Sequence, residues 1–245
     1  MKRSVAVGVV CIVTVWAAAQ GAYALDVTFT LDTPNSVLTM SGNILGSTIS
    51  AQGTGSLSTT YSGTISAQWT PGTILFTAAE ADANVNGTWQ PAVGGGAGSA
   101  AADYGGKVTL MVIITAYLAG RDAEFSLSSA PIALVGNNFD ATQVLITTTS
   151  GSVDYRAGTL GSGTQSLVGG SAPNQAAGGS LVVTGTDAVL TLPILYVTPV
   201  DIDGDGTDDS EMTITGTLRG TATVPEPATL ALVGLGGIVA LLRRR

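Results

Sequence analysis

The residues best suited to chemistry are six acids within the eleven positions 201–211. The stretch reads Asp-Ile-Asp-Gly-Asp-Gly-Thr-Asp-Asp-Ser-Glu, so carboxylates recur at alternate positions and glycines permit a sharp turn. Carboxylate and carbonyl oxygens are the ligands that Ca²⁺ prefers, and six like charges repel one another unless a cation lies between them. The spacing therefore predicts a calcium-binding loop.

The same stretch resembles the DxDxDG loop of calcium-binding proteins. By that resemblance the alternating acids offer side chains, the threonine offers its carbonyl, and the acid at 209 makes a direct or water-mediated contact. The candidate ligands are Asp201, Asp203, Asp205, Thr207, Asp209 and Glu211. An EF-hand needs Glu at the twelfth position, which is Met212 here, and the flanks are patterned as strands. We therefore expect a calcium-bound hairpin loop, and an acidic solvated turn is the alternative.

Catalytic groups are scarce in this sequence. It contains no histidine, which excludes histidine triads, and its one cysteine, Cys11, lies in an N-terminal apolar run, so residues 25–245 have no thiol for catalysis. Two carboxylate pairs remain for glycoside hydrolysis: Glu80 with Asp82, and Asp122 with Glu124. Because surface acids of this kind are usually only solvated, we expect a protein that is not an enzyme.

Two aromatic side chains, Trp89 and Tyr155, could stack on sugar rings. They support a carbohydrate-binding module, with or without assistance from calcium, as the alternative function, and a glycan-active hydrolase ranks third. Trp69 lies on an alternating strand face, where we expect it to fill the core.

The segment between residues 25 and 223 carries four basic and sixteen acidic residues, a formal charge of −12. This charge repels nucleic acid and anionic lipid headgroups and favours cation binding. We therefore expect no nucleic-acid partner.

Hydrophobic residues alternate with polar ones along most of this segment. The alternation is clearest at 38–44, 61–69 and 212–222, and no long amphipathic helix is evident. The pattern predicts an all-β domain over 25–223, built as an antiparallel β-sandwich or jelly roll, with a barrel as the second choice.

Some expectations are more local. We expect one core strand over 107–118, a helical turn at 78–83, and a long loop or irregular hairpins over 158–180. Thr-Ile-Ser-Ala-Gln occurs at 48–52 and again at 64–68, which suggests neighbouring strands of a meander, with a chance repeat as the alternative.

The N-terminal 24 residues have the pattern of an export signal. Lys2 and Arg3 precede an apolar run, and Ala22-Tyr23-Ala24 is a small-x-small cleavage site. We therefore expect residues 1–24 to be a signal peptide.

The C-terminal segment 224–245 combines three features. Pro225-Glu226-Pro227 forms a stiff, extended leash, residues 228–242 are apolar, and three arginines end the chain. As a single helix the apolar run is about 22 Å long, short of the roughly 30 Å hydrocarbon core, so it needs bilayer thinning or arginine snorkelling. The arginines are expected to stay cytoplasmic. An ordinary single-span anchor is the alternative.

In motif, spacing and basic end, this segment resembles the PEP-CTERM sorting signal of Gram-negative bacteria. The resemblance implies recognition, and cleavage near 225–227, by the membrane transpeptidase exosortase. It also implies insertion of residues 228–242 in the inner membrane, followed by delivery to the cell surface or extracellular matrix of a biofilm-forming bacterium. Extracellular polysaccharide is a further expected partner. We therefore expect an exported, non-catalytic surface or matrix protein.

Overall fold

The computed structural model describes residues 24–110, 113–200 and 210–225, and these residues form antiparallel strands joined by short turns. In the first half the strands are β1 (Leu25–Leu31), β2 (Val37–Ile44), β3 (Ser47–Thr48), β4 (Ser50–Ala51), β5 (Ser58–Thr70), β6 (Thr73–Ala83), β7 (Gly87–Trp89), β8 (Ala100–Ala102) and β9 (Tyr104–Leu110). In the second half they are β10 (Ile114–Ser128), β11 (Ile132–Ala133), β12 (Asn138–Phe139), β13 (Leu145–Arg156), β14 (Ser162–Ser166), β15 (Ser171–Pro173), β16 (Gly179–Thr184), β17 (Asp187–Val200) and β18 (Ser210–Thr223).

Four 3-10 turns complete the described secondary structure: η1 (Thr33–Asn35), η2 (Val93–Gly95), η3 (Ala141–Gln143) and η4 (Gly158–Leu160). Within the three described ranges, no helix is long and apolar enough to cross a bilayer. The all-β, antiparallel prediction is confirmed, while the helix expected in the tail falls outside the described residues.

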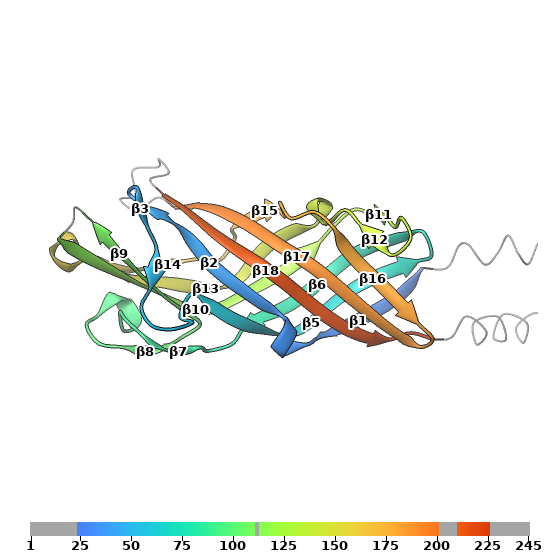
Figure 1. Cartoon of the computed structure of the whole chain (residues 1–245), viewed down its shortest axis with the longest axis horizontal. Helices are drawn as coiled ribbons and strands as arrows, with labels where there is room; N and C mark the ends of the chain where they lie inside the picture. The colour runs from blue at the N-terminus through green and yellow to red at the C-terminus, as the bar shows by residue number, and fades with distance from the viewer. Residues whose placement is uncertain (1–23, 111–112, 201–209, 226–245) are drawn as a thin grey trace, which may run out of the picture.

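One large sheet runs in the order β12-β16-β17-β18-β1-β5-β6-β10-β13-β14. β1 and β2 act as one strand interrupted by η1, because both pair with β18 on one side and with β5 on the other. The first strand of the domain is therefore held by its last strand. In Figure 1 the long strands cross an elongated molecule obliquely, and both described chain ends leave at the same end.

The sheet curls so that strands far apart in its order face each other across the core. Tyr61 on β5 stacks on Phe125 of β10, with ring centroids 5.7 Å apart, and Phe125 in turn lies 6.0 Å from Tyr196 of β17. Inward positions alternate along each strand as predicted, for example Ile65 on β5 and Ile214 on β18, which are both buried. Core packing therefore joins the two halves of the sheet.

The half of the molecule near the chain ends is closed by a small hairpin. β11 pairs with β6, and β12 pairs with β16, so the hairpin bridges two separate strands of the sheet. Phe139 of β12 packs on Phe76 of β6 at 5.7 Å, and Val224 is buried beyond the end of β18. Large buried side chains occupy the interior of this half, which we call the filled half.

A buried side chain, Asn174, links the β13 side of the sheet to β17. Its Nδ2 donates to the carbonyls of Ala141 and Pro193 at 3.1 and 2.8 Å, and its Oδ1 accepts from the amide of Leu195 at 2.8 Å. Asn174 follows β15, which pairs with β13. The amide therefore provides side-chain hydrogen bonds where the strand ladders stop.

The outer face of β10 and β13 is covered by the segment 87–102, and a buried ion pair holds it there. Arg121 Nε donates to Asp154 Oδ2 at 2.7 Å. The same guanidinium donates to the carbonyls of Pro91, at 2.7 Å, and Ala101, while Gly94 N donates to Asp154 at 3.1 Å. The pair therefore fixes both the covering segment and the sheet wall beneath it.

Three local expectations were wrong. Residues 107–118 are not one strand but parts of β9 and β10, which pair as a hairpin; both show apolar alternation, so the pattern concealed the turn. Residues 78–83 belong to β6, because alternate alanines point inward. The two copies of the repeat are not neighbours: 64–68 lies within β5, while 48–52 borders β2 and β9.

Residues 158–180 form irregular hairpins, as one of the two expectations had it. The short strands β14 and β15 both pair antiparallel with β13.

Candidate functional site

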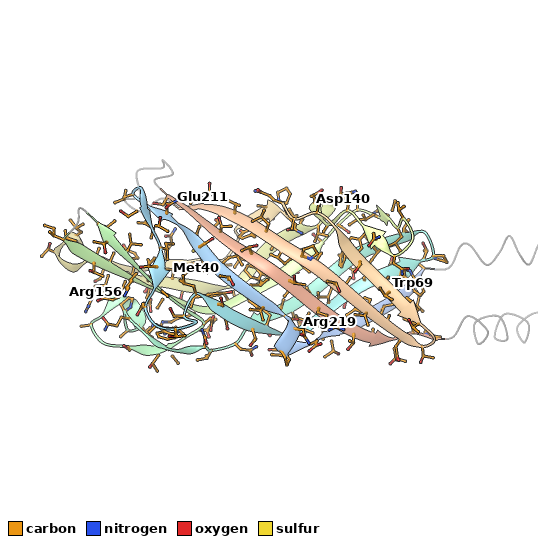
Figure 2. The ribbon with its side chains drawn as sticks, in the orientation of Figure 1. Met40, Trp69, Asp140, Arg156, Glu211 and Arg219 are labelled. Carbon is orange, nitrogen blue, oxygen red and sulfur yellow. The ribbon has the colours of Figure 1, made fainter. Side chains whose placement is uncertain are left out.

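The interior of the half away from the chain ends contains a cavity of about 650 Å³. Its walls come from β2, β5, β9, β10, β13, β14, β17 and β18. β3, β9 and β14 mark this half in Figure 1, and Figure 2 labels Met40 and Glu211 within it, with Trp69 at the opposite end. The volume falls within the roughly 300–1,000 Å³ of typical small-molecule sites.

Small inward residues create this space. The walls include Ala116, Gly120 and Ala123 on β10, where the other half of the molecule has larger aliphatic residues at inward positions. Gly106, on the neighbouring β9, also points inward, because a Cβ there would lie 2.9 Å from Ile49. The sheet therefore keeps its alternation here but lacks the side-chain volume to fill the interior.

Aromatic residues form the deepest part of the cavity. Tyr61, Tyr104, Phe125 and Tyr196 all line it and are each 6 % exposed or less. The hydroxyls of Tyr61 and Tyr104 hydrogen-bond each other at 3.0 Å. Burial raises the pKa of both phenols well above the ordinary value, so both stay neutral at physiological pH.

Two further hydroxyls face the cavity without a protein partner. Tyr196 and Thr148 are each 4 % exposed, and among the described residues neither side-chain hydroxyl has a hydrogen bond. Both lie close to Gly170: a Cβ on that residue would be 3.0 Å from Tyr196 Oη and 3.8 Å from Thr148 Oγ1. Neither oxygen is among the fully buried unpartnered atoms of the described residues, so both keep accessible surface, and a bound molecule can hydrogen-bond to them.

The mouth of the cavity is apolar. Three of its lining residues are unusually exposed for their type: Leu45 at 51 %, Leu160 at 56 % and Val168 at 59 %. Leu45 is also strained, because it has a φ of 47° in the two-residue turn between β2 and β3, a conformation that favours Gly or Asn. Among the described lining residues Glu211 is the only charged one, and none is basic.

The predicted calcium loop lies largely outside the described residues. Residues 201–209 join β17 to β18, and these strands pair up to Val200 and Ser210, so the strand flanks expected for a hairpin loop are present. Glu211, the described member of the ligand set, is exposed on β18 opposite Asn43. Within the described ranges, no group of three or more acidic, His or Cys side chains gathers as metal ligands.

The predicted sugar-stacking residues lie on opposite faces of the sheet. Tyr155 lines the cavity, where its hydroxyl would be 2.8 Å from a Cβ on Gly163. Trp89 packs on the outer face against Gly105, whose missing Cβ would be 2.4 Å from the indole, and the indole Nε1 is buried without a hydrogen bond in the described structure. The two rings therefore do not form one stacking platform.

The carboxylate pairs lie on the outer surface. Asp82 on β6 pairs in register with Glu124 on β10, which brings two of the four predicted acids together. Burial, and then the charge of Glu124, raises the pKa of Asp82. Glu80, Asp82 and Asp122 are exposed, and none of the four acids lines the cavity.

The two processing sites predicted from the sequence lie at the same end of the domain. Ala24 is exposed just before β1, and Pro225 is exposed just after β18. Thr30 and Leu31 of β1 pair with Thr221 and Gly220 of β18, which brings the two ends close together. Ala22, Glu226 and Pro227 lie outside the described residues.

Comparison with known proteins identifies the C-terminal segment. A family model of the PEP-CTERM protein-sorting motif matches residues 223–245, in agreement with the resemblance of the tail. No curated protein and no solved structure matches the chain. The motif marks the chain as an exported protein that is targeted by exosortase, with membrane-associated sorting in a Gram-negative bacterium.

The cavity was missed by the sequence analysis, although two signals for it exist. Tyr61 and Tyr196 occupy inward positions of strands, where an aromatic ring with a hydroxyl usually needs a polar partner. The turn Leu45-Gly46 has leucine where a type I′ hairpin normally has Asn or Asp. Neither signal identifies a cavity before the topology brings these residues together.

Proposed function

We propose that the chain is a non-catalytic protein of the cell surface or extracellular matrix, carried there as a sandwich-like β-domain. The sorting motif at 223–245 carries this proposal. The position of Ala24 and Pro225 at one end supports it further, because processing at either site leaves the paired strands intact. The opposite end of the domain then faces away from the membrane.

The absence of catalysis is supported by where the acids lie. The in-register pair Asp82 and Glu124 is on a convex outer face of the sheet, and the cavity has one carboxylate, Glu211, among its described lining residues. A glycosidase needs two carboxylates on either side of a bound sugar. Incubating the protein with polysaccharide from the producing cells should release no sugar, and turnover abolished by Asp82→Asn would overturn this part of the proposal.

The delivery proposal is tested by cell fractionation. Replacing Glu226 by Ala should leave unprocessed protein in the inner membrane, whereas the control Glu80→Ala, an exposed residue of β6 that does not line the cavity, should be processed and delivered normally. Removing exosortase from the producing strain should reproduce the Glu226→Ala result. Recovery of Glu226→Ala at the surface with normal processing, or of the native chain in the cytosol with both ends uncut, would contradict the proposal.

Carbohydrate binding remains the alternative. Since Trp89 and Tyr155 lie on opposite faces of the sheet, a polysaccharide on the outer surface would contact Trp89 and not Tyr155. Saturable binding to isolated extracellular polysaccharide, lost in Trp89→Ala and kept in Tyr155→Ala, would favour this function. Equal binding by both variants and the native chain would count against it.

A further inference from the structure

The cavity has the size of a ligand site, and its lining is mainly apolar. Its described walls are aliphatic and aromatic apart from hydroxyl and amide groups and the carboxylate of Glu211, and they include no Lys or Arg. An anionic ligand would enter without a counterion, which is costly in an apolar site. A cationic ligand would find the single carboxylate of Glu211 on the exposed β18 end. The lining thus favours an uncharged ligand.

The ligand also needs a polar group. The hydroxyls of Tyr196 and Thr148 face the cavity and have no hydrogen bond among the described residues, whereas those of Tyr61 and Tyr104 satisfy each other. Because Tyr196 and Thr148 both approach Gly170, one hydroxyl or carbonyl group placed there can reach both.

The mouth provides a third, independent observation. Leu45 keeps a left-handed backbone conformation and exposes half of its side chain, so the fold gains neither a favourable turn nor burial from having leucine there. Strain of this kind is expected where a residue serves a ligand. Leu160 and Val168 add exposed aliphatic surface to the same cavity.

We propose that the cavity binds an uncharged, mainly hydrocarbon molecule with one hydroxyl or carbonyl group. The polar group hydrogen-bonds to Tyr196 and Thr148, and the hydrocarbon part packs on Met40, Leu118 and Ile214. This site is separate from the sorting signal, and the inference does not depend on where the protein is delivered.

Photoaffinity labelling of the purified full chain tests the proposal. A diazirine derivative of hexadecanol should label peptides from β2, β13 and β17, and the matched derivative of hexadecanoate should label them about tenfold less, because its carboxylate is not accommodated. Unlabelled hexadecanol should compete. Equal labelling by both reagents, stronger labelling by the acid, or no labelling of these peptides would overturn the proposal.

The turn residue offers a variant that should not harm folding. Leu45→Asn suits the left-handed turn, so the melting midpoint should stay the same or rise, while labelling by the alcohol should fall at least about threefold. Val135→Asn is the matched control, because Val135 is 78 % exposed and does not line the cavity. Labelling of Leu45→Asn at the native level would contradict a ligand role for the mouth.

The hydroxyl contact is tested by Tyr196→Phe. Because the hydroxyl has no protein partner, the melting midpoint should not fall, yet labelling by the alcohol should drop about fivefold. Labelling by a diazirine alkane of the same length should stay unchanged. A lower midpoint with unchanged alcohol labelling would mean that the hydroxyl is structural and would overturn the assigned contact.

Discussion

The two halves of the molecule differ in the size of the side chains that fill their interiors. Near the chain ends, inward positions carry large residues such as Ile74, Phe76, Leu190 and Leu192, and the β11–β12 hairpin closes the interior. In the other half, alanine and glycine occupy several inward positions of β9 and β10, and a cavity remains. The strands β5, β10, β17 and β18 run through both halves, so the difference lies in side-chain volume and not in topology.

This difference shows that alternation and filling are separate properties of a sheet. Period-two patterning decides which face a residue takes, and residue size then decides whether the enclosed space is solid. Core packing contributes less to the stability of the cavity half, so interactions outside the core must contribute more. In the cavity half, the covering segment 87–102 and the ion pair of Arg121 with Asp154 reinforce the wall from outside.

The largest effect should come from that outer reinforcement. Arg121→Met leaves Asp154 buried without its charge partner and should lower the free energy of unfolding by about 3–5 kcal/mol. In the filled half, Arg219 lies 3.8 Å from Asp32 with a 43 % exposed side chain, so Arg219→Met should cost under about 1 kcal/mol. Urea unfolding measures both, and equal losses would show that the two ion pairs do not differ in this way.

Matched truncations compare the interiors directly. Leu190→Ala removes a fully buried side chain from the filled half and should cost about 3–4 kcal/mol. Leu118→Ala enlarges a space that already exists, so it should cost only about 1–2 kcal/mol. Urea unfolding curves with equal m values would give the two losses in the free energy of unfolding. A larger loss for Leu118→Ala than for Leu190→Ala would contradict the proposed difference between the two interiors.

Titration should distinguish two acids of the cavity half. Burial raises the pKa of Asp103 to about 6, despite the hydrogen bond from Ala123 N at 3.0 Å. Below about pH 4 both folded and unfolded chains carry this proton. Between about pH 4 and 6 only the folded chain keeps it, so the free energy of unfolding should fall by about 2 kcal/mol as pH rises. Asp103→Asn should remove this decline; an unaltered profile would exclude Asp103 as its cause.

Asp154 should act in the opposite direction. Burial alone would raise its pKa, but hydrogen bonds from Thr164, Arg121 and Gly94 outweigh burial and lower it. The stability that Asp154 contributes to the folded chain is therefore complete above the ordinary pKa of an aspartate. It is lost as pH falls through the lower pKa of the folded state. The two acids thus affect separate pH ranges.

The smallest expected effect concerns the predicted calcium ligands among residues 201–209. If residues 201–209 bind calcium with millimolar affinity, 10 mM Ca²⁺ should raise the melting midpoint by about 4 °C. Asp203→Asn with Asp205→Asn should abolish the rise, and Mg²⁺ at equal ionic strength is the control. An unchanged midpoint with and without chelator would remove the predicted metal site.

The sequence predicts strands well and their partners poorly. Alternation placed Ile65 and Ala67 inward on β5, and Ile214 and Leu218 inward on β18, as the structure has them. It could not indicate that β1 and β2 both lie between β5 and β18, because strand pairing depends on contacts between distant segments. The repeated pentapeptide failed for the same reason.

Local sequence also predicts the sorting segment but not the cavity. The Pro-Glu-Pro motif, apolar run and terminal arginines are contiguous, so a linear pattern contains the whole signal. The cavity is assembled from β2, β10, β13, β14, β17 and β18, which span most of the domain. Thr148 and Tyr196 approach Gly170 together only after these strands have met.

The pairing of β1 and β2 with β18 imposes an order on maturation. If residues 1–24 direct export from the N-terminus, as the sequence predicts, the sheet cannot be completed until Thr223 has left the translocation channel, and the sorting motif is then the next segment to follow. The open edges of β1 and β2 would stay unpaired until that point, and an unpaired edge strand is a site where incomplete chains can aggregate.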